Sequence, residues 1–287
     1  MLWNLHCGWL AFVTLPKTQV VEHDADETKE MSFWDHLDEL RVRLVRIVLA
    51  ILAMAIIAFI NRQVVFDLII LGPSKADFIT NKWLCALGEL LNIDGLCFSN
   101  LKIQIININM SGQFLVHLYT SAVAGVVLAF PYIIYQFWGF VRPALHAGEK
   151  KKSRQAIFYS SLLFASGLLF GYFLIVPLTI NFLGTYQVSS SVSNQIALNS
   201  FISTVVSVSF AVGIVFQLPL LIYFLAKAGL VSPDYLKRNR KYMLVILLIV
   251  SAIITPPDIF SQIMVCIPLI GLYEISIGIA RRAYKEV

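Results

Sequence analysis

The chain has 287 residues, of which 58% are hydrophobic and 14% are charged, and its formal net charge is +5. Soluble domains carry about one quarter charged residues, so this composition excludes an ordinary soluble protein and indicates a polytopic membrane protein. The basic residues stand in short clusters between apolar runs, a distribution typical of membrane orientation, so nucleic-acid binding is not expected.

The N-terminal segment precedes all of the predicted membrane spans. Residues 1–15 are apolar, but they lack a basic start and a small-residue cleavage site and are too short to cross a bilayer. Five acidic residues follow between positions 22 and 30. We expect residues 1–31 to be a disordered cytoplasmic extension, residues 32–282 to form one membrane domain, and residues 283–287 to be a short cytoplasmic tail.

Residues 33–43 predict a short amphipathic helix lying on the membrane surface. Phe33, Leu37, Leu40 and Leu44 are spaced four, three and four residues apart, which places them on one face of a helix. Most of the charged residues of this segment lie off that face. The chain then becomes almost wholly apolar, so the amphipathic segment leads directly into a membrane span.

Six apolar runs follow, and a span needs about 20 such residues to cross the bilayer. They cover approximately residues 45–60, 113–137, 156–183, 196–226, 242–254 and 259–280. The fifth run is too short for a normal bilayer, and we expect the sixth helix to be short as well. Prolines at positions 131, 177, 219 and 268 should kink the helices that contain them, which favours a concave body. The predicted fold is an all-α membrane protein with six transmembrane helices.

Two long loops connect these spans on one side of the membrane. The first, residues 61–112, contains a run with partial apolar alternation at 101–110 that predicts a short strand. The same loop contains Cys85 and Cys97. These two residues form either a disulfide, in an oxidising compartment, or two free thiols, and the sequence favours neither. The second loop, residues 184–195, is rich in Ser and Asn and uncharged.

The distribution of the 22 Lys and Arg residues predicts the orientation. With six spans, the two termini lie on the same side as the basic loops 141–155 and 227–241. The opposite side contains only Arg62, Lys75, Lys82 and Lys102. The positive-inside rule therefore places both termini in the cytoplasm.

The sequence contains no catalytic, nucleotide-binding or metal-binding motif that we recognise, so we expect neither enzymatic activity nor a cofactor. Two acidic residues deserve a functional hypothesis. Glu39 is four residues before Arg43, so a helix-surface ion pair worth about 0.2–0.5 kcal/mol is a sufficient explanation for it. Glu149 is the single acid of a basic loop, where it is either neutralised by its neighbours or binds a cationic ligand.

Polar residues also lie in or beside the later spans. Gln217 precedes Pro219 within the fourth span, and it either packs through a hydrogen bond beside small residues or has a functional role. Asp258 and Gln262 lie where the sixth span begins. Asp258 is suited to capping that helix, which is the simpler explanation.

In chain order, the motifs resemble those of the TatC family, the multispanning core subunit of the twin-arginine protein translocase. The resemblance extends from about residue 33 to residue 282. The matching segments are 36–43 (HLDELRVR), 72–73 (GP), 135–145 (YQFWGFVRPAL), Glu149, 170–173 (FGYF) with Pro177, 216–219 (FQLP) and 255–262 (TPPDIFSQ).

This resemblance implies a glove-like, concave fold of six spans, two of them short, with both termini in the cytoplasm. It also implies a receptor for twin-arginine signal peptides that is the assembly core of a translocase. Such a translocase exports folded proteins across the bacterial inner membrane, driven by the proton-motive force. By the same resemblance, Glu39 and Glu149 accept the guanidinium groups of the signal peptide. The residues expected to shape the same surface are Arg41, Arg43, Phe140 and Pro143.

Partners are also implied by the resemblance. TatA- and TatB-type single-span subunits would dock along the fourth to sixth spans and contact Gln217, Asp258 and Gln262, and the chain would form homo-oligomers within the complex. Many members of the family have a glutamate where this chain has Gln217, which leaves a neutral hydrogen-bonding contact there rather than a proton-linked role. The alternative function is a proton-coupled small-solute transporter. It would need an ionisable group within a span, and the one such acid, Glu274, lies near the cytoplasmic boundary.

Overall fold

The computed structural model describes residues 33–75, 77–91, 104–141, 153–189, 194–255 and 259–285. This part of the chain is mostly helical, in agreement with the predicted fold class. Within it, five helical stretches are long and apolar enough to cross a membrane, and they correspond to the first four and the sixth of the predicted spans. They are Leu37–Ile60, Gly112–Phe140, Gln155–Thr185, Leu198–Lys227 and Ser261–Tyr284.

The last two predicted spans differ from each other in length. The fifth is helix α9 (Arg240–Ile254), whose 15 residues extend about 22 Å, less than the thickness of a hydrocarbon core. The prediction of a short sixth helix is wrong, because α10 (Ile259–Lys285) has 27 residues and contains Pro268 without ending there. Helix α10 also continues through the predicted domain boundary at residue 282.

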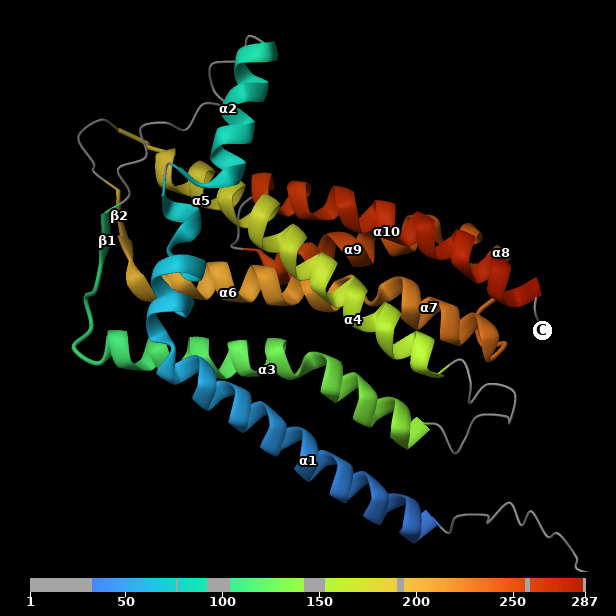
Figure 1. Cartoon of the computed structure of the whole chain (residues 1–287). Coiled ribbons are helices and arrows are strands. Elements are labelled where there is room, and N and C mark those ends of the chain that lie inside the picture. Colours follow the sequence, from blue (N-terminus) through green and yellow to red (C-terminus); the bar gives the residue numbers. More distant parts are fainter. Residues whose placement is uncertain are drawn as a thin grey trace, which may run out of the picture.

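Helix α1 (Phe33–Ile60) is a single helix of 28 residues (Figure 1). The predicted amphipathic helix and the first predicted span are thus parts of one helix, in agreement with an amphipathic segment that leads directly into the span. The segment contains neither proline nor glycine, so nothing in the sequence forces a break between its charged and its apolar part. Helix α1 packs mainly against α3 (Gly112–Val141), and most of its aliphatic side chains remain exposed.

Helices α1 and α3 approach each other closely at Gly125. A Cβ atom added there would lie 2.8 Å from the Cβ and the backbone N of Ala55 and from the carbonyl O of Ile51. Because two of these three atoms belong to the backbone of α1, they cannot move without moving the helix. Small residues at such positions allow membrane helices to pack tightly.

Replacing Gly125 by alanine should therefore lower the free energy of unfolding by about 1–3 kcal/mol, the usual cost of overpacking. The measurement is a denaturation series on purified protein in detergent. Gly271→Ala is the matched control, because a Cβ added to this glycine of α10 meets no atom within 4 Å. Equal stability of the two variants would contradict the close approach of α1 and α3.

The third and fourth predicted spans are each divided near a proline. The third consists of α4 (Ser153–Phe170), a π-helical segment η6 (Gly171–Ile175) and α5 (Val176–Thr185), which begins beside Pro177. The fourth consists of α6 (Leu198–Val215) and α7 (Leu218–Lys227), separated by a turn just before Pro219. Proline lacks a backbone N–H and its ring clashes with the preceding turn, which explains both irregularities.

The long loop between α1 and α3 is more structured than the sequence indicates. It contains a π-helical segment η1 (Val64–Ile70), a 3₁₀ turn η2 (Gly72–Ser74) and helix α2 (Ile79–Leu91). Pro177 has no N–H to donate to the carbonyl of Phe173, and the hydroxyl of Thr80 on α2 donates to that carbonyl instead. The Tyr172 hydroxyl donates to the carbonyl of Ile69 at 2.5 Å. The loop is thus fixed to η6 through side-chain hydrogen bonds.

A short parallel strand pair joins the two loops at the same end of the molecule. Strand β1 (Gln104–Ile106) lies within the predicted strand region and pairs with β2 (Gln195–Ala197), in the register Gln104 to Gln195. The sequence did not predict β2. It lies at the end of the Ser- and Asn-rich loop, directly before α6.

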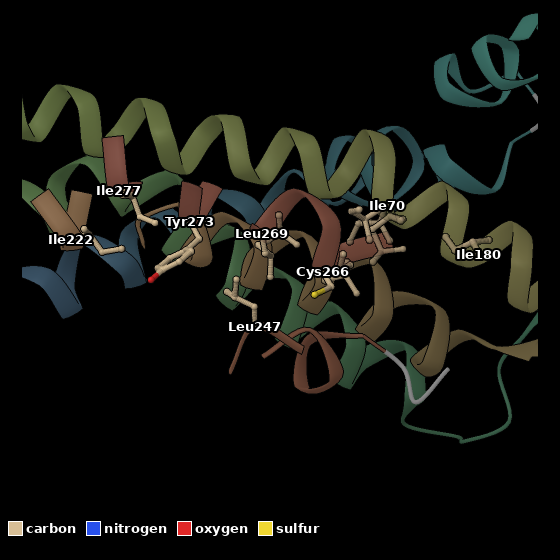
Figure 2. Packing of buried hydrophobic residues seen from close by; sticks show 14 of the residues in the cluster. Ile70, Ile180, Ile222, Leu247, Cys266, Leu269, Tyr273 and Ile277 are labelled. Atoms are coloured by element: carbon tan, nitrogen blue, oxygen red, sulfur yellow. The ribbon is translucent and has the colours of Figure 1, made fainter. Parts of the chain in front are cut away.

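The buried apolar core is built around α6. Its most buried side chains include Ile202, Val208 and Val212. They belong to one cluster with residues of α5, α7, α9 and α10, of which Figure 2 labels Ile180, Ile222, Leu247 and Leu269. Tyr273 of α10 is buried and donates a hydrogen bond of 2.8 Å to the carbonyl of Leu236, in α8 (Pro233–Arg238). The start of α1 and the end of α10 lie at the same end of the bundle (Figure 1).

Candidate functional site

The N-terminal part of α1 and the C-terminal part of α3 meet in a polar cluster around Arg43. The Nε and Nη2 atoms of Arg43 donate to Oε1 of Glu39, at 3.0 Å and 2.5 Å. Its Nη1 atom donates to Oε1 of Gln136 at 3.3 Å. The predicted pair between Glu39 and Arg43 is present, and the guanidinium also connects α1 to α3.

Gln136 holds the other side of this cluster in place. It is 4% exposed, and its Nε2 atom donates to the hydroxyl of Tyr132 at 2.6 Å. Gly139 lies one turn further along α3, and a Cβ added there would overlap the guanidinium of Arg43. Gln136 therefore accepts from Arg43 while donating to Tyr132, and Gly139 provides the space in which the guanidinium lies.

The two carboxylate oxygens of Glu39 have different surroundings. Oε1 accepts both hydrogen bonds from Arg43, whereas Oε2 is buried and accepts none within the described part of the chain. Glu39 also lines a cavity of about 330 Å³, together with Asp38, Val42, Arg43 and Arg46. A buried carboxylate oxygen without a donor is costly, so this one is suited to accept a hydrogen bond from a ligand.

The remaining residues predicted for this surface are only partly described. Arg41 is exposed on α1, and Phe140 is half-buried near the end of α3. Pro143 and Glu149 lie outside the described residues, so their distances from Glu39 are not part of the structure. The end of α3 is also held by Trp138, whose ring centroid is 4.5 Å from that of Phe224 on α7.

Gln217 is hydrogen-bonded within the chain. Its Oε1 atom accepts from the hydroxyl of Ser160 at 2.7 Å, and its Nε2 atom donates to the carbonyl of the same residue at 3.1 Å. Ser160 belongs to α4 and is almost fully buried. Both ends of the amide are therefore satisfied across the contact between the third and fourth spans, which agrees with the packing explanation for Gln217.

Replacing Gln217 by leucine should lower the free energy of unfolding by about 0.6–1.7 kcal/mol, the range for hydrogen bonds between membrane helices. Ser160→Ala removes the hydrogen bond from the Ser160 hydroxyl to Gln217 and leaves the bond to its backbone carbonyl. The double variant should cost less than the sum of the two single variants, because they disrupt one interaction. Denaturation of the three variants in detergent tests this, and strictly additive losses would contradict the pairing.

The structure describes one residue of each remaining predicted pair, Gln262 for partner contact and Cys85 for the disulfide. Gln262 donates to the carbonyl of Leu248 on α9 at 3.1 Å, and Asp258 lies outside the described residues. Cys85 is disulfide-bonded in the structure. Cys97 lies outside the described residues, so the pair Cys85–Cys97 stays a prediction.

Sequence reasoning missed Gln136 and Gly139 as parts of the cluster. Both lie inside the 135–145 motif, but the pattern of that motif does not show which residue faces Arg43. A glutamine within an apolar helix was the available signal, because an intramembrane amide needs a hydrogen-bond partner. Among the described residues, no group of three His, Cys, Asp or Glu side chains is arranged to hold a metal ion.

Known proteins resemble this chain over nearly its whole length. The family model for the Sec-independent protein translocase protein TatC matches residues 35–268. The TatC protein of Blattabacterium sp. subsp. Periplaneta americana is 42% identical over 265 residues, which cover 91% of this chain and 99% of the relative. The TatCy protein of Bacillus subtilis is 31% identical, over 91% of this chain and 92% of the relative.

A crystal structure of the twin-arginine translocase receptor TatC has a similar fold. It superposes with a TM-score of 0.65 at 32% sequence identity, and the match covers 86% of this chain and 99% of the crystallised one. These relatives are protein translocase components, so the small-solute transporter is not favoured. The chain belongs to the TatC family of Sec-independent protein translocase proteins, which are membrane transport subunits and not enzymes.

Proposed function

We propose that this chain is the receptor for twin-arginine signal peptides in its translocase and that Glu39 binds one of the two arginines directly. Glu149, from the loop between α3 and α4, accepts the other arginine. Arg41, Arg43, Phe140 and Pro143 form the surrounding surface.

The observation that carries this proposal is the unequal use of the Glu39 carboxylate. Arg43 donates twice to Oε1, while Oε2 is buried and accepts no hydrogen bond within the described residues, and Glu39 lines a cavity. An arginine entering this cavity finds a carboxylate that Arg43 already holds in a fixed orientation. Hydrogen bonds between guanidinium and carboxylate are among the strongest in proteins, and a fixed acceptor reduces the entropy lost on binding.

The basic residues around Glu39 also favour selective binding of arginine over unselective attraction of cations. Arg43 and Arg46 line the same cavity as Asp38 and Glu39, so a general cation gains little from the total charge. A ligand must place its guanidinium beside Oε2 to benefit. Geometric selection of this kind distinguishes arginine, with its planar fork of donors, from lysine.

We further propose that the chain crosses the bacterial inner membrane six times, with α9 as a short fifth span and both termini in the cytoplasm. The clustering of Lys and Arg in the loops on the side of the termini supports this orientation. TatA- and TatB-type single-span subunits dock along the fourth to sixth spans, and Ile253, Ile263 and Ile267 are exposed on the last two, α9 and α10. Gln217, Asp258 and Gln262 contact these partners.

Transport is driven by the proton-motive force, and precursor binding triggers assembly of the partners around homo-oligomers of this chain. The proton-motive force then acts on the assembled complex.

Glu39→Gln tests the receptor proposal. It should weaken the binding of a twin-arginine peptide by about 1.5–3 kcal/mol, the value of a hydrogen bond to a charged group. The measurement is fluorescence anisotropy of a labelled peptide with the purified chain in detergent micelles. Glu89→Gln is the control, since Glu89 is exposed on α2, at the opposite end of the molecule from Glu39. Equal affinity of wild type and Glu39→Gln would refute the direct role of Glu39.

A further inference from the structure

A second cavity lies at the opposite end of α1 from the Arg43 cluster. Its volume is about 600 Å³, within the usual range for small-ligand sites. It lies between η1, the first turns of α3 and the first residue of α6. The residues that matter for its chemistry are Arg62, Phe66, Asp67, Phe114 and His117. None of them belongs to the proposed peptide site.

Arg62, which precedes η1, and Phe66 and Asp67, which belong to η1, line the same cavity. The backbone N–H of Leu71 donates to the carbonyl of Phe66 at 2.8 Å, a bond to the fifth preceding residue. An α-helix places residues four apart on one face, and the wider winding of a π-helix turns the fifth residue toward that face as well. Single π-helical turns inside longer helices occur frequently at functional sites.

His117 fixes the opposite wall. Its ring stacks on Phe59 with a centroid separation of 4.0 Å, and its Nε2 atom lies 3.1 Å from the carbonyl O of Phe59. The ring edge of Phe66 also contacts His117, at a centroid separation of 5.4 Å. The cavity therefore has a wall held by aromatic contacts between α1, η1 and α3.

Two opposite charges line this cavity without forming an ion pair. Within the described residues, neither Arg62 nor Asp67 has a salt bridge, whereas Glu39 pairs with Arg43 and Glu274 with Arg240. Lys75 donates to the backbone carbonyl of Asp67 and leaves the carboxylate free. A ligand that carries both a negative and a positive group would satisfy both side chains at once.

The depth of the cavity identifies the kind of ligand. Arg62 follows the end of the first candidate span at Ile60, and Phe114 and His117 lie near the start of the second at Gly112. The cavity therefore lies where the apolar spans meet the polar boundary of the bilayer. Phe114, which lines the cavity, is 62% exposed, and Ile60, two residues before Arg62, is 73% exposed, so exposed apolar side chains accompany the charged groups.

We propose that this cavity binds the headgroup of a zwitterionic aminophospholipid. The guanidinium of Arg62 binds the phosphate, the carboxylate of Asp67 accepts hydrogen bonds from the primary ammonium, and Phe114 contacts the acyl chains. Arginine is suited to phosphate because its donors match two oxygens, and the ring of Phe66 adds a cation–π contact for the ammonium. A choline headgroup has no N–H to donate, and a glycerol headgroup has no cation for Asp67.

The test is native mass spectrometry of the purified full-length chain in detergent, titrated with phosphatidylethanolamine, phosphatidylcholine and phosphatidylglycerol of identical acyl chains. Wild type should bind the ethanolamine lipid about tenfold more tightly than the choline lipid. Asp67→Asn should remove this preference, and Asp67→Glu should keep most of it. Arg62→Gln should weaken binding of all three lipids by about tenfold, because each contains the phosphate.

Lys82→Gln is the matched control, because it changes a charge at the same end of the molecule as the cavity. Lys82 is exposed on α2, where it pairs with Asp77 at 3.3 Å, and it does not line the cavity. The Lys82→Gln variant should prefer the ethanolamine lipid over the choline lipid to the same extent as wild type. Equal binding of ethanolamine and choline lipids by wild type would overturn the proposal, and so would an unchanged preference in Asp67→Asn. Neither result depends on whether the chain binds twin-arginine peptides.

Discussion

Arg43→Met should lower the free energy of unfolding by about 1.5–3 kcal/mol, because it leaves the Glu39 carboxylate without any donor and removes a donor from Gln136. The side chains of Arg43 and Glu39 are only 21% and 24% exposed, so water does not fully replace the lost bonds. Methionine keeps most of the length and apolar contact of the arginine stem. The measurement is equilibrium unfolding of purified protein by SDS titration.

A second variant separates the charge effect from a packing effect. If the cost arises from an unpaired carboxylate, adding Glu39→Gln to Arg43→Met should restore part of the lost stability, since the double variant has no uncompensated charge. If the cost arises from packing alone, the double variant will be no more stable than Arg43→Met. A loss below about 0.5 kcal/mol in Arg43→Met would show that the cluster does not join α1 to α3.

Asn181→Asp should destabilise the chain more strongly, by about 3–5 kcal/mol at a pH where the new carboxyl is ionised. Asn181 is 0% exposed, and its Nδ2 atom donates to Oδ1 of Asn81 at 3.0 Å. Asn81 in turn donates to the carbonyl of Lys75 at 3.1 Å. An aspartate would replace a donor by a charged acceptor facing another acceptor, and it would disconnect the loop of α2 from α5.

The same substitution at an exposed position is the control for Asn181→Asp. Asn107 is exposed beyond β1, and its Nδ2 atom donates to the carbonyl of Asn109. Asn107→Asp should cost less than about 1 kcal/mol, because water can solvate the new charge. Similar losses for both variants, measured by the same SDS titration, would contradict the buried role of the Asn81–Asn181 bond.

The sequence predicted those features that depend on local patterns. Apolar runs located all five long candidate spans and the short α9, alternation located β1, and the spacing of four residues predicted the bond from Arg43 to Glu39. The sequence also placed the amphipathic segment directly before the first apolar run, and the structure joins the two in one helix, α1.

Contacts between distant segments could not be predicted in this way. Gln136 is 93 residues from Arg43, and Ser160 is 57 residues from Gln217. Such contacts depend on how two helices are rotated about their axes and where they cross, and the helical period leaves both unspecified. The partner strand β2 was missed for a related reason, since its three residues contain too little alternation to distinguish them from a loop.

The central claim is that Glu39 contacts an arginine of the signal peptide directly. A double-mutant cycle measures such a contact, because it compares Glu39→Gln, an arginine-to-glutamine change in the peptide, and both changes together. Peptide affinities for the purified chain, determined at one salt concentration, give the coupling energy. Repeating the cycle with Glu89→Gln provides the background value for a distant acid.

The proposal predicts a coupling energy of about 1.5–3 kcal/mol between Glu39 and one of the two peptide arginines, and a value near zero for Glu89. Losses that add within about 0.5 kcal/mol for both peptide arginines would show that Glu39 and the peptide do not touch. In that case the Arg43 cluster would only join α1 to α3, and the receptor surface would lie elsewhere on the chain.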